Sequence, residues 1–324
     1  MNSSSSSTSS MYDFHDPSNL IAAIMMVANG LFGLFSNGSI IYIFYKESSE
    51  RTAFNLFCVS RALISIYILI TSFFLVFLIS TILGFSLFPG NIDSFFIMTS
   101  LSFYVGNEYQ VAIIAVNRFI SLFFPFFYQH YCGIKPTLLV LIGFFFYRVF
   151  MIYWEVFHIM GDNCDTLFFP EHLTWYFNTE DRCQYGQDAF NGALVIFLSM
   201  TLLNVITFCR ILWFYKSSQN YSKEAERRAK KNAMLFFQTL LQDSLYIIDL
   251  TFTYKLSSLS THRFWSFISG TFVWECLHSL DGFIMLMFNE RLSLFKFRSP
   301  SPTVSVAPAH STTISHMRVH PGVV

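Results

Sequence analysis

The stretch from Ala53 to Ser80, AFNLFCVSRALISIYILITSFFLVFLIS, decides the fold because it contains a single charged side chain, Arg61. A helix needs about 20 mostly apolar residues to cross a hydrocarbon core of roughly 30 Å. Comparable apolar runs recur along the chain. Together they are residues 20–45, 53–80, 94–120, 137–157, 188–215, 233–256 and 264–288. The sequence therefore predicts an all-α membrane protein with a bundle of seven transmembrane helices.

Composition excludes an ordinary soluble fold. Hydrophobic residues make up 53% of the chain and charged residues 12%, whereas soluble domains average about 25% charged. The serine-rich start and the Pro/Ser/Thr-rich end lack apolar periodicity. We therefore expect an extracellular disordered tail (1–19), a transmembrane domain (20–288), and a short juxtamembrane helix followed by a disordered cytoplasmic tail (289–324).

Charge distribution predicts the orientation. Cytoplasmic flanks retain lysine and arginine, and with the amino terminus outside, only Arg182, Lys255 and Arg263 of the 20 basic residues lie on the outer side. We expect a multi-pass plasma-membrane protein with its N terminus outside. The zero net charge gives no reason to expect a nucleic-acid partner. Asn2-Ser3-Ser4 is an outer glycosylation sequon.

Two cysteines share the outer loop between the fourth and fifth predicted helices. An oxidising exterior allows Cys164 and Cys183 to form a disulfide. The alternative is two free thiols that happen to share a loop.

Ionisable residues inside the spans are costly in hydrocarbon, so each is a candidate for function. Arg61 lies roughly 12 Å, and Asp281 roughly 10 Å, from the inner ends of their helices. These matching depths predict that the two residues pair. Glu108, Arg148, Asp243 and Glu275 fall about 15 Å deep, near the midplane.

The sixth predicted helix carries a polar stripe. Gln238, Gln242 and Asp249 lie four and seven residues apart, with Asp243 about 100° around the helix. The stripe should face the bundle. These residues either hold helices together as simple hydrogen-bonding groups, at about 0.6 kcal/mol each, or form a network with two arrangements that a ligand biases.

Catalytic and cofactor chemistry finds little support. His278 lies one turn beyond Glu275, and we expect it to hydrogen-bond within the polar network because no second histidine or cysteine offers metal-ligand spacing nearby. No phosphate-binding glycine loop, nucleophile elbow or zinc-protease motif is present. The last span contains no lysine for a retinal Schiff base. We expect no enzyme, metal or cofactor. A ligand-gated channel or small-molecule transporter remains the alternative class, although no inverted repeat is visible.

The inner end of the third predicted helix is the strongest cytoplasmic feature. Asn117, Arg118 and Phe119 stand at this boundary, where an arginine reaches water or turns toward a partner. A basic inner loop at 223–231 can meet acidic partner surfaces or anionic lipid. The alternative is that the positive charge of this loop only sets the membrane topology.

These residues resemble the nematode serpentine chemoreceptors of class X (Srx), within the seven-transmembrane, G-protein-coupled receptors. The matching pieces are GLFSN at 33–37, FCVSRA at 57–62, NRF at 117–119, FQTLLQD at 237–243, WE at 274–275, LDG at 280–282 and FN at 288–289. Compared with rhodopsin-like receptors in general, Asn117 replaces an acidic residue and Asp281-Gly282 replaces Asn-Pro. No outer cysteine lies in the third helix, so the resemblance leaves Cys164 and Cys183 to bridge within their own loop.

The resemblance implies a function. It implies a rhodopsin-like bundle that binds a small environmental molecule, signals through a heterotrimeric G protein and resides in the plasma membrane of sensory neuron endings. We expect the ligand in the outer half of the bundle under the 158–187 loop, with Asn117, Arg118 and Phe119 at the G-protein contact.

Overall fold

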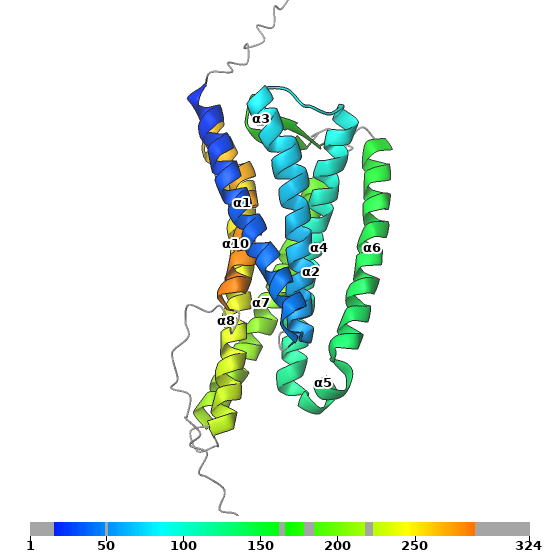
Figure 1. Cartoon of the computed structure of the whole chain (residues 1–324), viewed down its shortest axis with the longest axis vertical. Coiled ribbons are helices and arrows are strands. Elements are labelled where there is room, and N and C mark those ends of the chain that lie inside the picture. The colour runs from blue at the N-terminus through cyan, green and yellow to red at the C-terminus, as the bar shows by residue number, and fades with distance from the viewer. Residues whose placement is uncertain (1–15, 49–50, 162–165, 178–184, 218–222, 289–324) are drawn as a thin grey trace, which may run out of the picture. The chain divides into compact units, whose positions relative to one another are not determined.

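The computed structural model describes residues 16–48, 51–161, 166–177, 185–217 and 223–288, which belong to one unit of the chain (Figure 1). They are almost entirely helical. In chain order the elements are α1 (Pro17–Lys46), α2 (Ala53–Ile68), the π-helix η2 (Leu69–Leu78), α3 (Ile79–Leu83), α4 (Gly90–Phe123), α5 (Pro125–Tyr131), α6 (Ile134–Gly161), β1 (Thr166–Phe169), β2 (Thr174–Phe177), α7 (Tyr185–Ser217), α8 (Lys223–Thr251), the π-helix η4 (Phe252–Leu256), the 3-10 turn η5 (Ser257–Leu259), α9 (Arg263–Ser266), the π-helix η6 (Phe267–Phe272) and α10 (Val273–Met287).

The described helices run through every apolar stretch that the sequence predicts. Within the described residues, four segments are long and apolar enough to cross a membrane by length and composition alone. They are Pro17–Lys46, Ala53–Leu83, Ile134–Trp154 and Leu194–Trp213. The remaining long helices, α4, α8 and α10, carry most of the buried carboxylates, including Glu108, Asp243 and Asp281, which lower their hydropathy.

Helix α1 begins three residues earlier than the sequence predicts because its first turn is well capped. The Oδ1 atom of Asp16 accepts a hydrogen bond from the backbone N–H of Ser18 at 2.9 Å, and Pro17 occupies the first helical position. Arg263 also donates to Asp16 at 2.6 Å. Both interactions, with that of Ser18 foremost, hold the pKa of the Asp16 carboxyl below its ordinary value.

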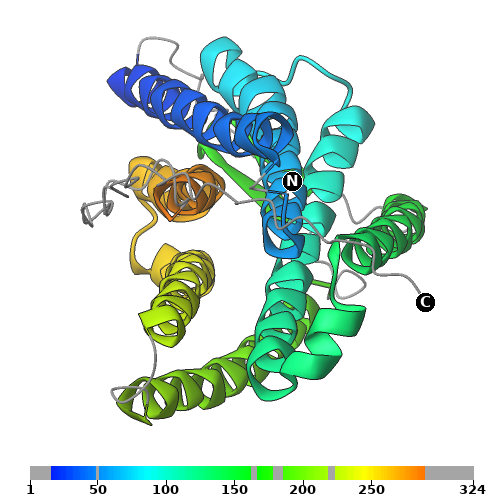
Figure 2. The ribbon, with the colours of Figure 1, turned by 60° about the horizontal axis from the view of Figure 1, so that its bottom comes forward.

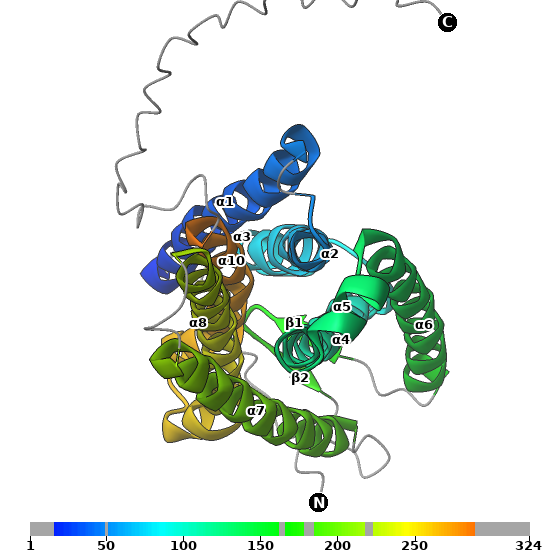
Figure 3. The ribbon, with the colours of Figure 1, turned by 90° about the horizontal axis from the view of Figure 1, so that it is seen from below.

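The helices surround a common interior. Helices α1 and α10 lie side by side in both views of the ribbon (Figures 1 and 2). Seen along the bundle in Figure 3, α1, α2, α4, α7, α8 and α10 enclose the centre, while α6 stands outside against α4. The end of the bundle that carries β1 and β2 is called the hairpin end below, and the opposite end the α5 end.

A β-hairpin that the sequence did not reveal covers the hairpin end. Strands β1 and β2 are antiparallel, with Thr166 opposite Phe177. Phe168 stacks on Phe77 of η2 with ring centroids 4.5 Å apart, and Leu173 is fully buried. The indole N–H of Trp175 donates to the carbonyl of Gly270 at 3.3 Å. The hairpin therefore fills space between the helix ends instead of standing in solvent.

Polar and apolar residues are distributed as expected for a protein in lipid. Many large apolar side chains lie on the outer surface, such as Phe35, Leu139 and Phe146, which are 70%, 73% and 68% exposed. An apolar exterior of this extent needs an apolar environment. The interior contains both a hydrophobic cluster, with Phe73 and Trp274 near its centre, and a set of polar side chains.

One predicted inner segment differs from expectation, and one short inner helix was not predicted. Residues 223–231, expected as a basic loop, form the first turns of α8, because glutamate, alanine, arginine and lysine are all good helix formers. After α4 ends at Phe123, Pro125 starts the short helix α5, since proline is favoured in a first turn.

In the part of the chain that the structure describes, the π-helical stretches η2, η4 and η6 interrupt the helical runs in the half nearer the hairpin. A π-turn changes the phase of side chains around a helix, and such turns are frequent at functional sites. These stretches make the helix backbone irregular, as proline does in many membrane helices. The hairpin half is therefore the irregular half of the bundle.

The contact between α1 and α10 yields a first prediction. A Cβ atom added to Gly282 would lie 2.6 Å from the side-chain amide of Asn37, which is buried and held by two hydrogen bonds. Gly282→Ala should therefore lower the stability of the purified protein by about 1 to 3 kcal/mol, measured by thermal unfolding in nanodiscs.

Gly143→Ala is the matched control. Gly143 is also helical, and a Cβ there meets no atom within 4 Å, so alanine should be neutral or stabilise by up to about 1 kcal/mol. Equal stability of the two variants would contradict the close packing of α1 on α10.

Candidate functional site

The buried ion pair between α2 and α10 is the centre of the polar interior. The Nη2 atom of Arg61 donates to Oδ1 of Asp281 at 2.7 Å, and its Nε atom donates to Oδ2 at 3.3 Å. Gln242 of α8 adds a 2.7 Å hydrogen bond to the same Oδ1. Arg61 is fully buried and Asp281 is 1% exposed. The structure thus brings Arg61 and Asp281 together, as their matching depths predict, and joins three helices.

Helix α1 is joined to this centre through Asn37. Its side-chain N–H groups donate to the carbonyls of Gly33 and of His278 on α10, at 2.9 and 3.1 Å. His278 in turn contacts Ser65 of α2, with 3.4 Å between Nδ1 and Oγ. His278 therefore lies within the polar network, as the sequence indicates, whereas the role of Asn37 was missed.

Helix α8 makes two further polar contacts. Asn204 of α7 donates to Oδ2 of Asp243 at 2.8 Å, and the hydroxyl of Tyr104 on α4 donates to Oδ2 of Asp249 at 2.9 Å. All four residues are buried. The partners of the two aspartates, Asn204 and Tyr104, were not identified from the sequence. Asn204 could have been, because it is a polar residue in an apolar run, and that is the criterion by which the other polar residues in the spans were found.

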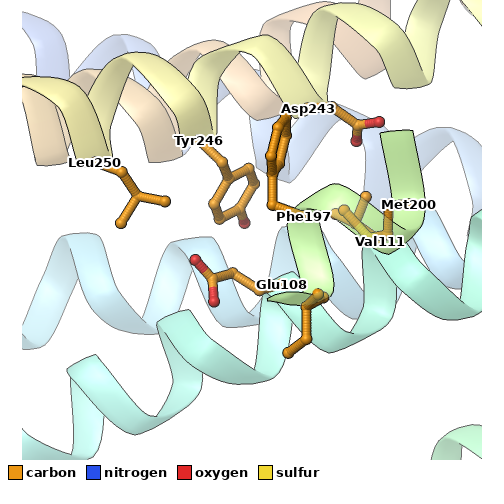
Figure 4. Close-up of a pocket in the computed structure, with 8 residues that line it drawn as sticks. Glu108, Val111, Phe197, Met200, Asp243, Tyr246 and Leu250 are labelled. Carbon is orange, nitrogen blue, oxygen red and sulfur yellow. The ribbon is translucent and has the colours of Figure 1, made fainter. Parts of the chain in front are cut away.

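A small cavity lies between α4, α7 and α8 (Figure 4). Its lining is mixed, with two carboxylates, two aromatic rings and four aliphatic side chains. The lining residues are Glu108, Val111, Ile196, Phe197, Met200, Asp243, Tyr246 and Leu250. Figure 4 shows the carboxyl of Glu108 and the hydroxyl of Tyr246 pointing toward one another across this space. We call it the mid-bundle cavity.

Arg118 closes the α5 end of the bundle. Its Nη1 atom donates to the hydroxyl of Thr239 on α8 at 2.7 Å, and its guanidinium lies 4.8 Å from the ring centroid of Phe54. Arg118 is 8% exposed, and with Asn117 it lines a second cavity. In this arrangement α4 and α8 are tied together. Phe119 stacks on Phe123 instead.

The other predicted polar residues are buried but lie apart from this centre. Arg148 of α6 donates to the carbonyl of Ser102 at 2.5 Å and lies on the face of α4 that carries Gly106 and Tyr109. Glu275 lies against α1 at Gly30.

Gln238 contacts Cys58, with 3.8 Å between its Nε2 atom and the sulfur. Cys164, Cys183 and Asn2, for which a disulfide and glycosylation were predicted, lie outside the described residues.

The interior therefore has the character of a membrane receptor bundle, with polar contacts among helices and cavities at two depths. The chain belongs to the family described as serpentine type 7TM GPCR chemoreceptor Srx, whose model matches residues 27–289. It is also similar to serpentine receptor class X 45 of Caenorhabditis elegans, with 26% identity over 297 residues, covering 84% of this chain and 79% of that relative.

Membership of this family has direct consequences. The chain is a multi-pass membrane protein with a chemoreceptor role, and its family is one of receptors and not of enzymes. The resemblance that the sequence motifs carried is confirmed.

The ion pair yields a second prediction. Arg61→Met or Asp281→Leu should each cost roughly 3 to 5 kcal/mol, because either change leaves one buried charge without its partner. The loss should appear as reduced surface expression and a lower unfolding temperature. The exchanged pair, Arg61→Asp with Asp281→Arg, should recover part of it.

Lys135→Ala serves as a control for loss of positive charge because Lys135 is exposed. An exchanged pair no more stable than the single variants would show that the mutual contact does not stabilise the bundle.

Proposed function

We propose that this chain is a G-protein-coupled chemosensory receptor. It binds a small environmental molecule in the hairpin half of the bundle and signals by a rearrangement of helices at the α5 end. All seven helical runs cross the plasma membrane of sensory neuron endings in a rhodopsin-like arrangement, with the amino terminus and the hairpin outside.

Charge supports this orientation. The α5 end carries basic residues such as Arg51, Lys135 and Arg210, and α8 begins there with a basic stretch. Segments near the hairpin end carry few basic residues. Retention of positive charge on the cytoplasmic side then assigns the α5 end to the cytoplasm.

The observation that carries the proposal is the set of polar contacts that α8 makes along its length. Asp249 bonds to α4, Asp243 to α7 and Gln242 to α10, and Thr239 bonds to Arg118 at the α5 end. The mid-bundle cavity is lined by α8 residues between these contacts. A ligand there touches the helix whose far end holds Arg118.

Arg118 is suited to a partner contact once α8 moves. Its Nε and Nη2 atoms have no hydrogen-bond partner among the described residues, and a cavity lies beside it. Displacement of Thr239 would also leave the Nη1 atom of Arg118 without its acceptor. The motion required is a shift of a packed helix, which is a recurrent type of allosteric change.

The third prediction concerns Arg118. Arg118→Ala should abolish ligand-stimulated nucleotide exchange by a coexpressed G protein, because Arg118 is the proposed contact with that protein. Surface expression should stay intact, because the groups that Arg118 contacts in the bundle, Thr239 and Phe54, are uncharged. Lys135→Ala, which removes an exposed basic residue at the same end, should leave exchange unchanged. A ligand-gated current without nucleotide exchange would instead support the channel alternative.

The fourth prediction concerns the closed arrangement. Thr239→Val keeps the shape of the side chain but removes the hydroxyl that accepts from Arg118. Because a hydrogen bond to a charged group contributes about 1.5 to 3 kcal/mol, the equilibrium should move toward the open form by about 10-fold or more. Ligand-free nucleotide exchange should rise accordingly. Unchanged basal exchange would show that this contact does not hold the closed state.

A further inference from the structure

The guanidinium of Arg118 is satisfied differently from that of Arg61. In Arg61 the Nε and Nη2 atoms, which form one edge of the guanidinium, donate to the two oxygens of Asp281. In Arg118 the same two atoms have no hydrogen-bond partner among the described residues, although the side chain is only 8% exposed. Its Nη1 atom donates to Thr239. The edge of Arg118 that suits a pair of oxygens is therefore available to a ligand.

A buried guanidinium and a buried carboxyl respond differently to the lack of a partner. A carboxyl group is neutralised by binding a proton, whereas the guanidinium of arginine is not deprotonated in proteins. Asp243, one turn from Thr239 on α8, bonds to Asn204. No aspartate or glutamate is among the described residues that line the cavity beside Arg118. A negative group in this cavity would therefore offset a charge that Arg118 cannot lose.

A second buried donor, from another helix, lines the same cavity. Thr207 of α7 is 2% exposed, and its hydroxyl has no hydrogen-bond partner among the described residues. Hydroxyls within helices often donate to the carbonyl one turn back, as those of Ser199 on α7 and Ser244 on α8 do. The hydroxyl of Thr207 is instead available to the cavity. Three further polar side chains in the lining are Asn117, Ser121 and Tyr128.

These donors specify the chemical class of the ligand. The two N–H groups along one edge of an arginine match carboxylate and phosphate, which accept both hydrogen bonds at once. A phosphate group has further oxygens with which to accept from a hydroxyl on a second helix. A chloride ion has only one acceptor atom. A phosphate group therefore uses the donors of α4 and α7 together.

We propose that the cavity between Arg118 and Thr207 binds a phosphate group, with two of its oxygens on the Nε and Nη2 atoms of Arg118 and a third accepting from Thr207. The group belongs to free inorganic phosphate or to the headgroup of a phosphorylated lipid. Bound phosphate competes with the G protein for Arg118 and thereby favours the closed arrangement. This regulatory consequence rests on the proposed function, in which the α5 end faces the cytoplasm.

The first test measures binding without a G protein. The purified full-length receptor in phosphatidylcholine nanodiscs is heated at pH 7 in sodium phosphate, acetate or chloride of equal ionic strength. A ligand of the folded state raises the unfolding temperature as its concentration rises, and concentrations of about 0.1 to 10 mM limit general salt effects. Phosphate should raise the unfolding temperature to a plateau. An equal rise in acetate or chloride would overturn the proposal.

Lipid composition distinguishes the two sources of the phosphate group. Nanodiscs that contain phosphatidylinositol phosphate are compared, in chloride, with nanodiscs that contain phosphatidylserine. Stabilisation by phosphatidylinositol phosphate without an effect of free phosphate would assign the site to a lipid headgroup. Equal stabilisation by phosphatidylserine, with no effect of free phosphate, would indicate attraction of anionic lipid to a basic surface and would overturn the site. Stabilisation by neither source of phosphate would also overturn it.

Variants assign the binding groups. Arg118→Met should weaken phosphate binding about 100-fold, because it removes the charge and both N–H groups. Arg118→Lys keeps the charge without the planar edge and should weaken binding about 10-fold. Thr207→Val should also weaken binding about 10-fold, by removing one hydrogen bond to a charged group. It keeps the shape of the side chain and removes a hydroxyl without a partner among the described residues, so it should fold even if the Arg118 variants do not.

Matched controls make these losses specific. Thr201→Val makes the same change at an exposed position of α7, and Lys135→Ala removes an exposed positive charge. Both variants should bind phosphate normally. Unaltered binding in Arg118→Met and Thr207→Val, or equal losses in Thr207→Val and Thr201→Val, would overturn the assignment of the site.

Nucleotide exchange by the purified receptor and G protein, measured separately, distinguishes this inference from the proposed function. Phosphate should slow ligand-free exchange over the concentrations at which it binds. Phosphate binding without any exchange would support the phosphate site and count against G-protein coupling. Exchange with no binding of free or lipid phosphate would support coupling and overturn the site. Binding that leaves the rate of exchange unchanged would overturn the competition for Arg118.

Discussion

The buried pair of Arg61 and Asp281 is the interaction on which the bundle depends. An arginine in the interior of a membrane protein must be paired, because its desolvation otherwise costs several kcal/mol. The two hydrogen bonds from Arg61, together with the one from Gln242, satisfy the carboxylate. This geometry can exist only where α2, α8 and α10 meet at the same depth. The pair therefore fixes the relative height and rotation of three helices, and the others pack around them.

Close approach of α1 to α10 follows from the same centre. Asn37 reaches the carbonyl of His278 only because Gly282 leaves room for its side chain. Farther toward the hairpin, the helices are joined both by aromatic packing, as of Phe73 against Trp274, and by hydrogen bonds such as that between Thr71 and Ser100. Polar contacts thus specify which helices are neighbours along the bundle, and the half nearer the hairpin also tolerates the irregular backbone of the π-helical stretches. The hairpin covers this irregular half.

Sequence reasoning predicted the apolar runs and the polar residues that the bundle buries. Each of the ionisable and amide residues predicted inside the spans, from Arg61 to Asp281, is buried. Hydrocarbon excludes such groups from the lipid face, so their burial follows from topology alone. The partners were harder to predict. Asn204 and Thr239 bond to Asp243 and Arg118 only because α7 and α8 have particular rotations, and one sequence does not specify rotation. The hairpin was also missed, because its strands are short and are held by tertiary contacts with Phe77 and Gly270.

Tyr246 connects the two parts of the interior. The guanidinium of Arg61 lies 5.8 Å from the centroid of its ring, while its hydroxyl reaches the mid-bundle cavity. One side chain is therefore in contact with the central ion pair on one side and with the cavity on the other. A group that enters the cavity and binds the hydroxyl acts on a ring that already packs against Arg61. The cavity and the ion pair are then coupled directly, because a group in the cavity and the guanidinium of Arg61 both act on the position of Tyr246. That helix also carries Thr239, so a displacement at Tyr246 is transmitted through the helix itself to Arg118.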